Sequence, residues 1–206
     1  MQNNINPILE NLFEYRSRKG DFKKVEIIQA SIECLATLGH EKTTYEAIAQ
    51  KVGTRRAHVA YHFSDKNELF KSAIRYILAT YQQVSIDHLE KAKSPKDMLN
   101  KYIKAAFTWA NDYPYQAKVI LLFYYFCSLD EEYLEMNDEL KHKGQERIQF
   151  ILKELGVKQS KTISGLIQNI ISSAIQDCLT MKNKSVQKSM NQTLKSVQII
   201  VEMNSI

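Results

Sequence analysis

Residues 43–63 read TTYEAIAQKVGTRRAHVAYHF, and this stretch decides the fold of the N-terminal part of the chain. Apolar side chains recur at helical spacing on both sides of Gly53, a residue type that readily adopts the backbone angles of a tight turn. The repeating apolar positions are Ile48, Ala49, Val52, Val59 and Phe63. The stretch therefore predicts two short helices joined at Gly53, a helix-turn-helix motif bounded by residues 44 and 63.

The flanking residues predict where the neighbouring helices begin and end. Thr43 and Glu46 have the spacing of a capping box, so the first helix of the motif is expected to begin there. An upstream apolar stripe predicts a helix that ends at Gly39. Downstream, Ser64 or Asp65 is expected to cap a long helix.

The second helix of the motif is basic. It carries Arg55, Arg56 and His58, and no Asp or Glu occurs from residue 47 to 64 of a chain in which 25% of residues are charged. A short basic helix held by a partner helix suits the major groove of DNA, where arginine can bind guanine O6 and N7 with two hydrogen bonds. The motif therefore predicts a protein that binds double-stranded DNA through the major groove.

The composition predicts an all-α protein with a core of its own. The 206 residues include only six glycines and three prolines, and 44% of the residues are hydrophobic. The helical stripes predict about nine helices, and the stripe near the N-terminus could form an additional one. A net charge of +5 permits a nucleic-acid partner without requiring one.

Several other classes of protein and site are not expected. The longest apolar run, residues 119–127, is too short to cross a membrane, and the first residues lack the apolar segment of a signal peptide. Cys34, Cys127 and Cys178 are odd in number and far apart, which favours free thiols in a cytoplasmic protein. No phosphate-binding loop, metal-spaced ligand set or nucleophile elbow occurs, so we expect no cofactor, no metal and no enzymatic activity.

Residues 1–20 are expected to form an extension with a basic arm. The segment from Ile5 to Phe13 carries an amphipathic stripe that should pack on the body or on a partner. Residues 16–24 hold five basic residues and one acidic residue, so they could enter the minor groove of DNA. A solvated linker explains the same composition equally well.

The head is expected to occupy residues 21–66 and a helical body residues 67–206. Pro114 breaks the body into segments, and residues 116–128 are apolar nearly all round, which predicts a central buried helix. An acidic run from Asp130 to Glu139 follows it and leads into a polar helix that Gly156 ends.

Aromatic residues concentrate in the body around Pro114. An apolar cavity with a few hydroxyl groups would suit a lipophilic or aromatic small molecule, although ordinary core packing explains most of these side chains equally well. The candidate ligand-binding residues are Trp109, Tyr113, Phe123, Tyr124, Phe126, Tyr81 and His88.

The last two helical stripes predict a dimer seam of four helices, two from each subunit. The alternative is that both stripes only close the core of the single chain. The candidate dimerisation residues are Ile163, Ile167, Ile170, Ile171, Ala174, Val186, Met190, Leu194, Val197 and Val201.

Residues 24–77 resemble the TetR family of bacterial transcriptional regulators. The matching positions, in order, are Leu38-Gly39, Thr43-Thr44, Ile48-Ala49, Gly53, Val59, His62-Phe63, Ser64, Lys66, Glu68 and Leu69. The resemblance implies DNA contacts from the threonine pair, the recognition helix and Lys66. Two positions depart from the family pattern, which usually has Ser where Arg55 stands and Tyr where Ala60 stands.

The motif and the resemblance together predict a homodimeric repressor that a small molecule releases from its operator. A helical regulator that acts through a protein partner, with weak or no specific DNA binding, is the alternative. The candidate DNA-binding residues are Thr43, Thr44, Arg55, Arg56, His58, Tyr61, His62, Lys66, Lys23 and Lys24.

Overall fold

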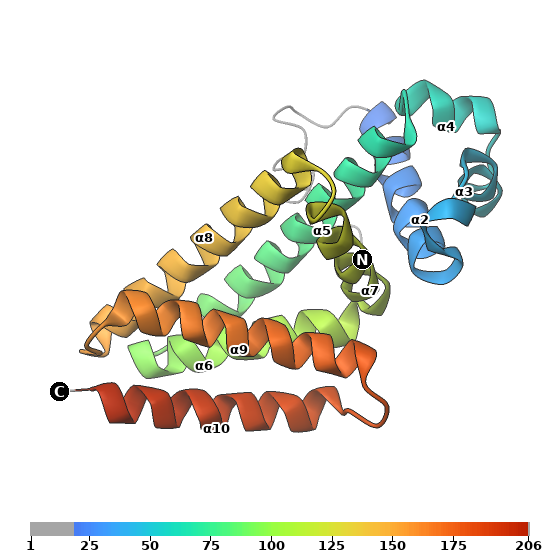
Figure 1. Cartoon of the computed structure of the whole chain (residues 1–206). Coiled ribbons are helices and arrows are strands. Elements are labelled where there is room, and N and C mark those ends of the chain that lie inside the picture. Colours follow the sequence, from blue (N-terminus) through green and yellow to red (C-terminus); the bar gives the residue numbers. More distant parts are fainter. Residues whose placement is uncertain (1–18, 206) are drawn as a thin grey trace. The chain divides into compact units, whose positions relative to one another are not determined.

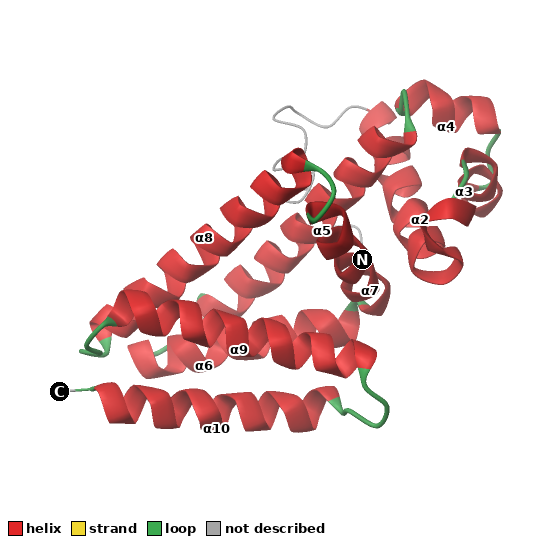
Figure 2. Ribbon diagram, in the orientation of Figure 1, coloured by secondary structure: helices red, strands yellow, loops and turns green. Residues whose placement is uncertain are grey.

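The computed structural model describes residues 19–205, which form helices joined by short turns (Figures 1 and 2). Nine helices and no strand occur in this part of the chain, which confirms the all-α prediction. The helices are α2 (Lys19–Lys42), α3 (Tyr45–Val52), α4 (Arg56–His62), α5 (Lys66–Leu89), α6 (Pro95–Asp112), α7 (Pro114–Cys127), α8 (Glu131–Glu154), α9 (Ser160–Thr180) and α10 (Val186–Asn204). The additional N-terminal helix and the arm residues Arg16 and Arg18 lie outside the described residues.

The contacts divide the chain into two compact units. The first unit contains the chain up to Gln83 together with Tyr115–Phe123, and the second contains Val84–Pro114 and the chain from Tyr124 onward. Both α5 and α7 therefore contribute residues to both units. The contact boundary falls at residue 83, whereas the boundary expected for the head was residue 66. Within residues 19–205, no helix has the length and apolar character needed to span a bilayer.

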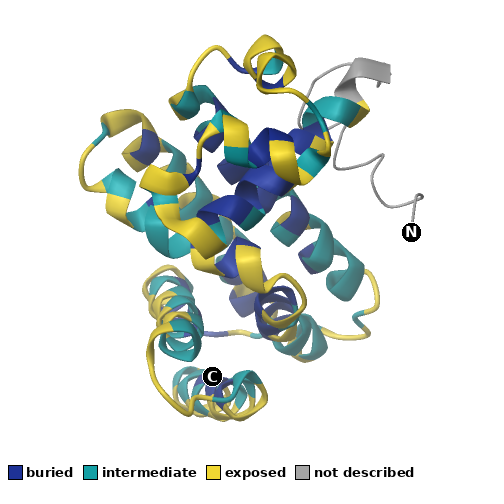
Figure 3. Ribbon diagram, turned by 90° about the vertical axis from the view of Figure 1, so that its right-hand side faces the viewer, coloured by how far each residue is buried: buried dark blue, intermediate teal, exposed yellow. Residues whose placement is uncertain are grey.

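The core of the first unit is built from apolar side chains of α2, α3, α4 and α5. The stripe predicted for α2 is buried, as are the apolar positions of α4 and α5 (Figure 3). Fully burying one such aliphatic or aromatic side chain stabilises the fold by roughly 1.5–3 kcal/mol. The residues are Val25, Ile28, Ile32, Leu35, Ile48, Ala49, Val59, Phe63, Leu69, Phe70, Ala73, Ile74 and Ile77. Val52, the remaining predicted position, is only half-buried.

The turn between α2 and α3 corrects the predicted capping box. Gly39 has φ 79° and ψ 171°, a conformation that essentially only glycine adopts, and it interrupts the helical backbone before Lys42. Thr43 faces inward, where it is 2% exposed and its hydroxyl donates to the Gly39 carbonyl at 2.7 Å. Thr44 is the N-cap instead, and its hydroxyl accepts from the amide of Ala47 at 3.2 Å.

The turn between α4 and α5 is capped by the predicted residues. The Asp65 carboxylate accepts from the Glu68 amide at 2.8 Å, and the Glu68 carboxylate accepts from the Ser64 amide at 2.8 Å. These bonds satisfy amides at the start of α5 and hold the pKa of Asp65 below its usual value, chiefly through the Glu68 amide. The end of the recognition helix is therefore followed at once by a well-defined helix start.

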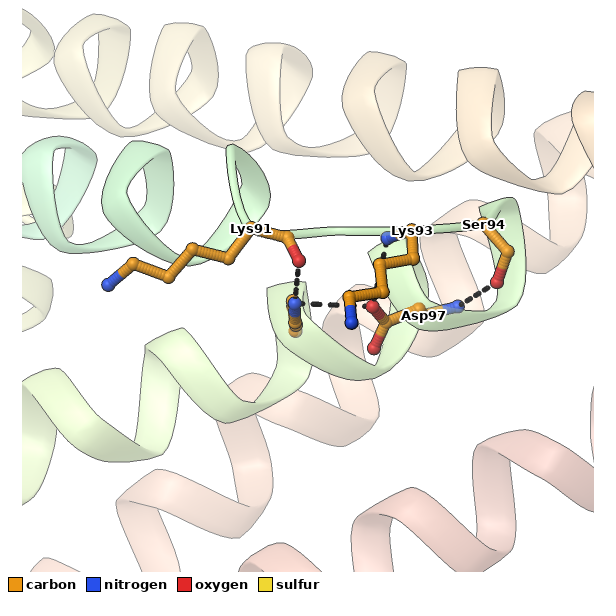
Figure 4. Close-up of polar contacts among 5 residues, drawn as sticks. Lys91, Lys93, Ser94 and Asp97 are labelled. Carbon is orange, nitrogen blue, oxygen red and sulfur yellow. Dashed lines mark hydrogen bonds and ion pairs between the residues drawn. The ribbon is translucent and has the colours of Figure 1, made fainter.

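A second capping arrangement starts α6 in the other unit (Figure 4). The Ser94 hydroxyl accepts from the Asp97 amide at 3.2 Å, and the Asp97 carboxylate accepts from the Lys93 amide at 3.0 Å. Lys101 pairs with Asp97 at 3.2 Å and donates to the Lys91 carbonyl. These contacts fix the start of α6, whose other face buries Tyr102, Phe107 and Trp109.

The prediction of a central buried helix is only partly right for α7. Its buried residues are Gln116, Ala117, Val119 and Phe123, whereas Tyr125 is 58% exposed. An apolar composition does not determine how many faces of a helix find a neighbour. One side of α7 is therefore covered, and the rest of its apolar surface is half-buried or exposed.

The acidic run has a local structural role at the start of α8. The Asp130 carboxylate caps the helix by accepting from the Glu132 amide at 2.9 Å, and Glu131 and Glu132 occupy the first turn. Negative charge is favourable there because the helix dipole places partial positive charge at its N-terminus. Gly156, with φ 69°, follows the end of α8, as predicted.

Candidate nucleic-acid interface

The turn between α3 and α4 has the backbone that the motif requires. Gly53 is left-handed, with φ 69° and ψ 39°, and its amide bonds to carbonyls of the preceding helix. The Thr54 amide donates to the Ala49 carbonyl at 2.8 Å, which closes the turn. An ion pair of 2.5 Å between Lys51 and Glu33 joins α3 to α2. Several backbone hydrogen bonds therefore hold the turn that precedes the second helix of the motif.

The recognition helix α4 turns one face inward and the other toward solvent. Val59 is fully buried, and Arg55 is the N-cap residue with an extended backbone (φ −95°, ψ 147°). Arg56 and His58 are exposed, and Tyr61 is 82% exposed. Neither arginine is ion-paired with a carboxylate among the residues that the structure describes. The outward face is therefore basic and available to an external partner.

Two histidines lie one turn apart on this face. The ring centroids of His58 and His62 are 5.1 Å apart, and Tyr61 meets His62 edge to face at 5.3 Å. The Thr54 hydroxyl lies 3.0 Å from His58 Nδ1. This contact orients the His58 ring and leaves its Nε2 for an external partner.

The first turns of α2 add positive charge near the C-terminal end of α4. The Lys24 ammonium lies 5.0 Å from the centroid of the Phe63 ring, and Lys23 pairs with Glu26 at 2.7 Å. Burial lowers the pKa of His62, and the charges of His58, Lys24 and Lys23 lower it further. These surroundings therefore favour the neutral form of the His62 imidazole in the absence of a ligand.

The remaining DNA-contact candidates, Thr43, Thr44 and Lys66, lie in different environments. Thr44 is exposed at the start of α3, where backbone amides favour an anion. The hydroxyl and amide of Thr43 both donate to the Gly39 carbonyl, so neither group is free for the predicted DNA contact, which stays a prediction. The Lys66 ammonium donates to the carbonyls of His40 and, at 3.5 Å, Glu41, and burial lowers its pKa. Lys66 thus binds the end of α2 rather than pointing freely outward.

Two polar side chains with a part in this geometry were not among the predicted site residues. The Tyr45 hydroxyl donates to the Phe63 carbonyl at 3.0 Å and so connects the start of α3 to the end of α4. Thr54 supports His58. Thr54 lies just before the N-cap of α4, and a side chain so close in sequence to the first turn could have indicated the second contact. No local pattern indicates the first, which spans 18 residues.

The head corresponds to a known family of regulators. Residues 27–73 match the profile described as bacterial regulatory proteins, tetR family. The segment that carries the motif is therefore similar to the DNA-binding head of the TetR family. Among curated relatives it is 24% identical over 107 residues to the HTH-type transcriptional regulator RutR of Escherichia coli strain K12. That match covers 52% of this chain and 50% of RutR, so the chain spans about half the length of this relative.

Two further transcriptional regulators are similar to this chain. The HTH-type transcriptional regulator YerO of Bacillus subtilis strain 168 is 31% identical over 121 residues, 58% of this chain and 39% of YerO. A transcriptional regulator of Saccharomonospora viridis, solved in complex with choline, superposes with a TM-score of 0.79 at 15% identity. The superposition covers 86% of this chain and 96% of the chain of that regulator. At that identity the likeness shows the fold alone, and it extends beyond the head through the helical body.

The two departures from the TetR pattern both lie on the exposed face of α4. Arg55 stands at the N-cap and brings a guanidinium where the family usually has a short hydroxyl side chain. Ala60 is exposed, so a methyl group replaces the usual tyrosine on the surface. Relative to that pattern, α4 therefore presents more charge at its start and less aromatic surface near its end.

The aromatic side chains predicted to bind an effector do not share one environment. Phe123 and Tyr81 belong to the first unit, and Phe123 is fully buried. In the second unit Trp109 is 6% exposed, Tyr113 is 38% exposed, and Phe126 packs on Tyr133 with centroids 5.7 Å apart. Burial raises the pKa of Tyr124, and His88 Nδ1 lies 2.9 Å from the Val84 carbonyl. Ligand binding by this set stays a prediction.

A hollow of about 230 Å³ lies between α9 and α10 and involves none of those aromatic residues. Its lining is mainly polar and includes Ser173, Asp177, Lys184 and Thr193. Asp177 and Lys184 pair loosely across it at 3.7 Å. The hollow therefore lacks the apolar lining expected for a lipophilic effector.

The ten candidate dimerisation residues divide into two groups. Four of them, Ile163, Ile167, Ile171 and Val197, are buried inside the second unit and serve its core. The other six, Ile170, Ala174, Val186, Met190, Leu194 and Val201, are half-buried. Larger exposed apolar side chains on the same two helices were not predicted: Leu166 is 46% exposed, Ile199 56% and Met203 80%. The apolar stripes of α9 and α10 therefore contain residues buried in the core as well as residues that are accessible to solvent.

Proposed function

We propose that the chain is a homodimeric TetR-family repressor that acts in the cytoplasm and releases its DNA operator when a small lipophilic or aromatic molecule binds the body. The observation that carries the DNA-binding part is the acid-free outward face of α4, on which Arg55, Arg56, His58 and Tyr61 are exposed. A face of this kind on a helix-turn-helix motif matches the chemistry of the major groove.

The position of the arginines supports base reading rather than phosphate binding alone. In helix-turn-helix proteins the N-terminal residues of the recognition helix contact base edges. Arg55 is the N-cap and Arg56 the first residue of α4, so both guanidinium groups leave the helix at that end. A guanidinium can bind guanine O6 and N7 together, and each such pair discriminates by about 1–3 kcal/mol.

A dimer would let two heads read half-sites about one turn of DNA apart. The exposed Leu166, Ile199 and Met203 of α9 and α10 are the best candidates for the seam, together with half-buried Ile170 and Leu194. Large apolar side chains on adjacent helices of one surface are typical of protein interfaces. The polar lining of the hollow would then place hydroxyl groups and water beside the apolar part of the seam.

Effector control would act through α5, which begins in the head and ends in the body. The Lys66 ammonium bonds to the end of α2, so the first turn of α5 is attached to the head. An effector that favours one arrangement of the body would shift the population of head orientations through this helix. Equal spacing of the two heads in crystals with and without the effector would contradict this part of the proposal.

The second candidate function is regulation through a protein partner with weak DNA binding. The exposed Ala60 favours it, because an aromatic contact of the family is missing from the surface of α4. The two functions differ in whether the protein makes many ionic contacts with DNA phosphates. The following experiment measures those contacts.

Salt-dependent binding to the region upstream of the protein's own coding sequence tests the proposal. A protein that neutralises several phosphates releases counterions, so the logarithm of its binding constant should fall steeply and linearly with the logarithm of salt concentration. We expect selective binding with a slope of about −0.9 for each phosphate contacted. Binding that is weak, unselective and insensitive to salt would favour the protein-partner function.

Operator affinity is expected to rise as the pH falls from 7.5 to 5.5. The pKa of His62 lies below its ordinary value of 6.5 in the free head, so the ring is neutral near pH 7. Nearby phosphates favour the charged form, and DNA binding would take up a proton in the acidic part of this range. For one proton the affinity can rise by at most about tenfold per pH unit.

Binding measured at constant ionic strength checks this expectation. A His62→Gln variant should lose most of the pH dependence. A His142→Gln variant should keep it, because His142 lies on α8, where its ring pairs with Glu146 at 3.3 Å. The same pH dependence in the His62→Gln variant and the unchanged protein would show that another group takes up the proton.

A further inference from the structure

The recognition helix needs support at its C-terminal end. It has seven residues, and its N-cap Arg55 makes no side-chain capping bond. A helix this short is not stable by its own hydrogen bonds in water, so its orientation depends on what it contacts. Val59 and Phe63 supply apolar contacts because both are fully buried. Apolar burial is not directional, and it therefore constrains rotation less than a hydrogen bond does.

Tyr45 supplies a directional contact at this end. Its hydroxyl donates to the carbonyl of Phe63 at 3.0 Å, and Phe63 is the residue at which α4 ends. Tyr45 is itself the first residue of α3, directly after the N-cap Thr44. The bond therefore joins the start of one helix of the motif to the end of the other.

The surroundings keep this hydroxyl a donor. Burial raises its pKa, and the nearby carboxylates of Asp65 and Glu68 raise it further, whereas Arg56 lowers it. The phenol is therefore protonated throughout the physiological range. A carbonyl at a helix end lacks an intrahelical partner, so the Tyr45 hydroxyl also satisfies a group that would otherwise need water.

We propose that Tyr45 is a positioning residue for DNA recognition, which fixes the orientation of α4 through the Phe63 carbonyl and does not itself contact DNA. This inference rests on the proposed DNA-binding function. The Lys66 ammonium acts in the same region by bonding the first turn of α5 to the His40 carbonyl. One bond joins the start of α3 to the end of α4, and the other joins the start of α5 to the end of α2, so together they hold the orientation of the recognition helix within the head.

The Tyr45→Phe variant removes the hydroxyl and keeps the ring. Hydrogen exchange on the free protein should show amides 59–66 exchanging about fivefold faster, the loss expected for one hydrogen bond, while the amides of α2 stay protected. The matched control is Tyr125→Phe, because Tyr125 is 58% exposed on α7. It should leave the exchange of α4 unchanged. Unchanged exchange in Tyr45→Phe would overturn the proposal without reference to DNA.

DNA binding by the same variants separates positioning from direct contact. We expect Tyr45→Phe to lose about three- to tenfold in operator affinity, with affinity for unrelated DNA and the salt slope both unchanged. Equal losses on operator and unrelated DNA would show a phosphate contact or partial unfolding and would overturn the proposal. A wild-type protein without preference for any DNA would overturn the DNA-binding function and this role with it, whereas the exchange result would still report on the bond.

Discussion

Replacing Arg55 and Arg56 together by alanine is expected to reduce operator affinity by about 100-fold or more. Each arginine that binds a guanine with two hydrogen bonds contributes about 1–3 kcal/mol of discrimination, and 1.4 kcal/mol corresponds to a factor of ten. Both side chains are exposed and are not ion-paired in the part of the chain that the structure describes, so their removal should leave the fold intact. Affinity for unrelated DNA should fall much less, because phosphate contacts elsewhere remain.

The matched control removes the same charge from other helices. Arg75 on α5 and Arg147 on α8 lie outside the motif, and an Arg75→Ala, Arg147→Ala variant has the same net charge as the first variant. Titration of labelled operator and of unrelated DNA with both variants measures the selectivity of each. If the control lost as much operator affinity as the α4 variant, net charge rather than the α4 face would account for binding.

Replacing Phe63 by alanine is expected to destabilise the protein by about 3–5 kcal/mol, the usual cost of deleting a buried aromatic ring. Phe63 is fully buried, its carbonyl accepts the Tyr45 hydroxyl, and its ring lies below the Lys24 ammonium. The substitution would leave a cavity where α4 meets the rest of the head. Operator binding at 37 °C should be lost along with the stability, since α4 is not stable alone.

The control for this prediction is Phe150→Ala on α8. Phe150 is 57% exposed, so its removal uncovers little new apolar surface and should change stability by less than about 0.5 kcal/mol. Urea unfolding of the three proteins, followed by circular dichroism, measures the differences. Similar unfolding midpoints for Phe63→Ala and Phe150→Ala would contradict the burial of Phe63 as the source of its effect.

Local patterns in the sequence predicted the head well. The helical recurrence of Ile48, Ala49 and Val59 identified both helices of the motif, and each of these side chains is buried. Gly53 was identified as the turn because few other residues tolerate a positive φ, and it has φ 69°. Such features depend on neighbours within one or two turns, so the sequence contains the information needed to find them.

The caps show how far local patterns reach. The prediction that Ser64 or Asp65 caps α5 was right, because the bonds run only three or four residues along the chain. The capping box at Thr43 was wrong by one residue. Two adjacent threonines satisfy the pattern almost equally, but Thr43 is buried and bonds to the Gly39 carbonyl, so Thr44 is the residue that caps α3.

The sequence by itself determined that the chain is helical, where the motif lies, and that the exposed face of its second helix is basic, since periodicity and charge are properties of short segments. Tertiary structure decided that Lys66 bonds to the end of α2, that Tyr45 holds the end of α4, and that four residues of the predicted dimer seam lie in a core. It also decided that α7 is covered on one side only. Each of these outcomes depends on which distant segment lies opposite a side chain, and packing between segments far apart in the sequence determines that.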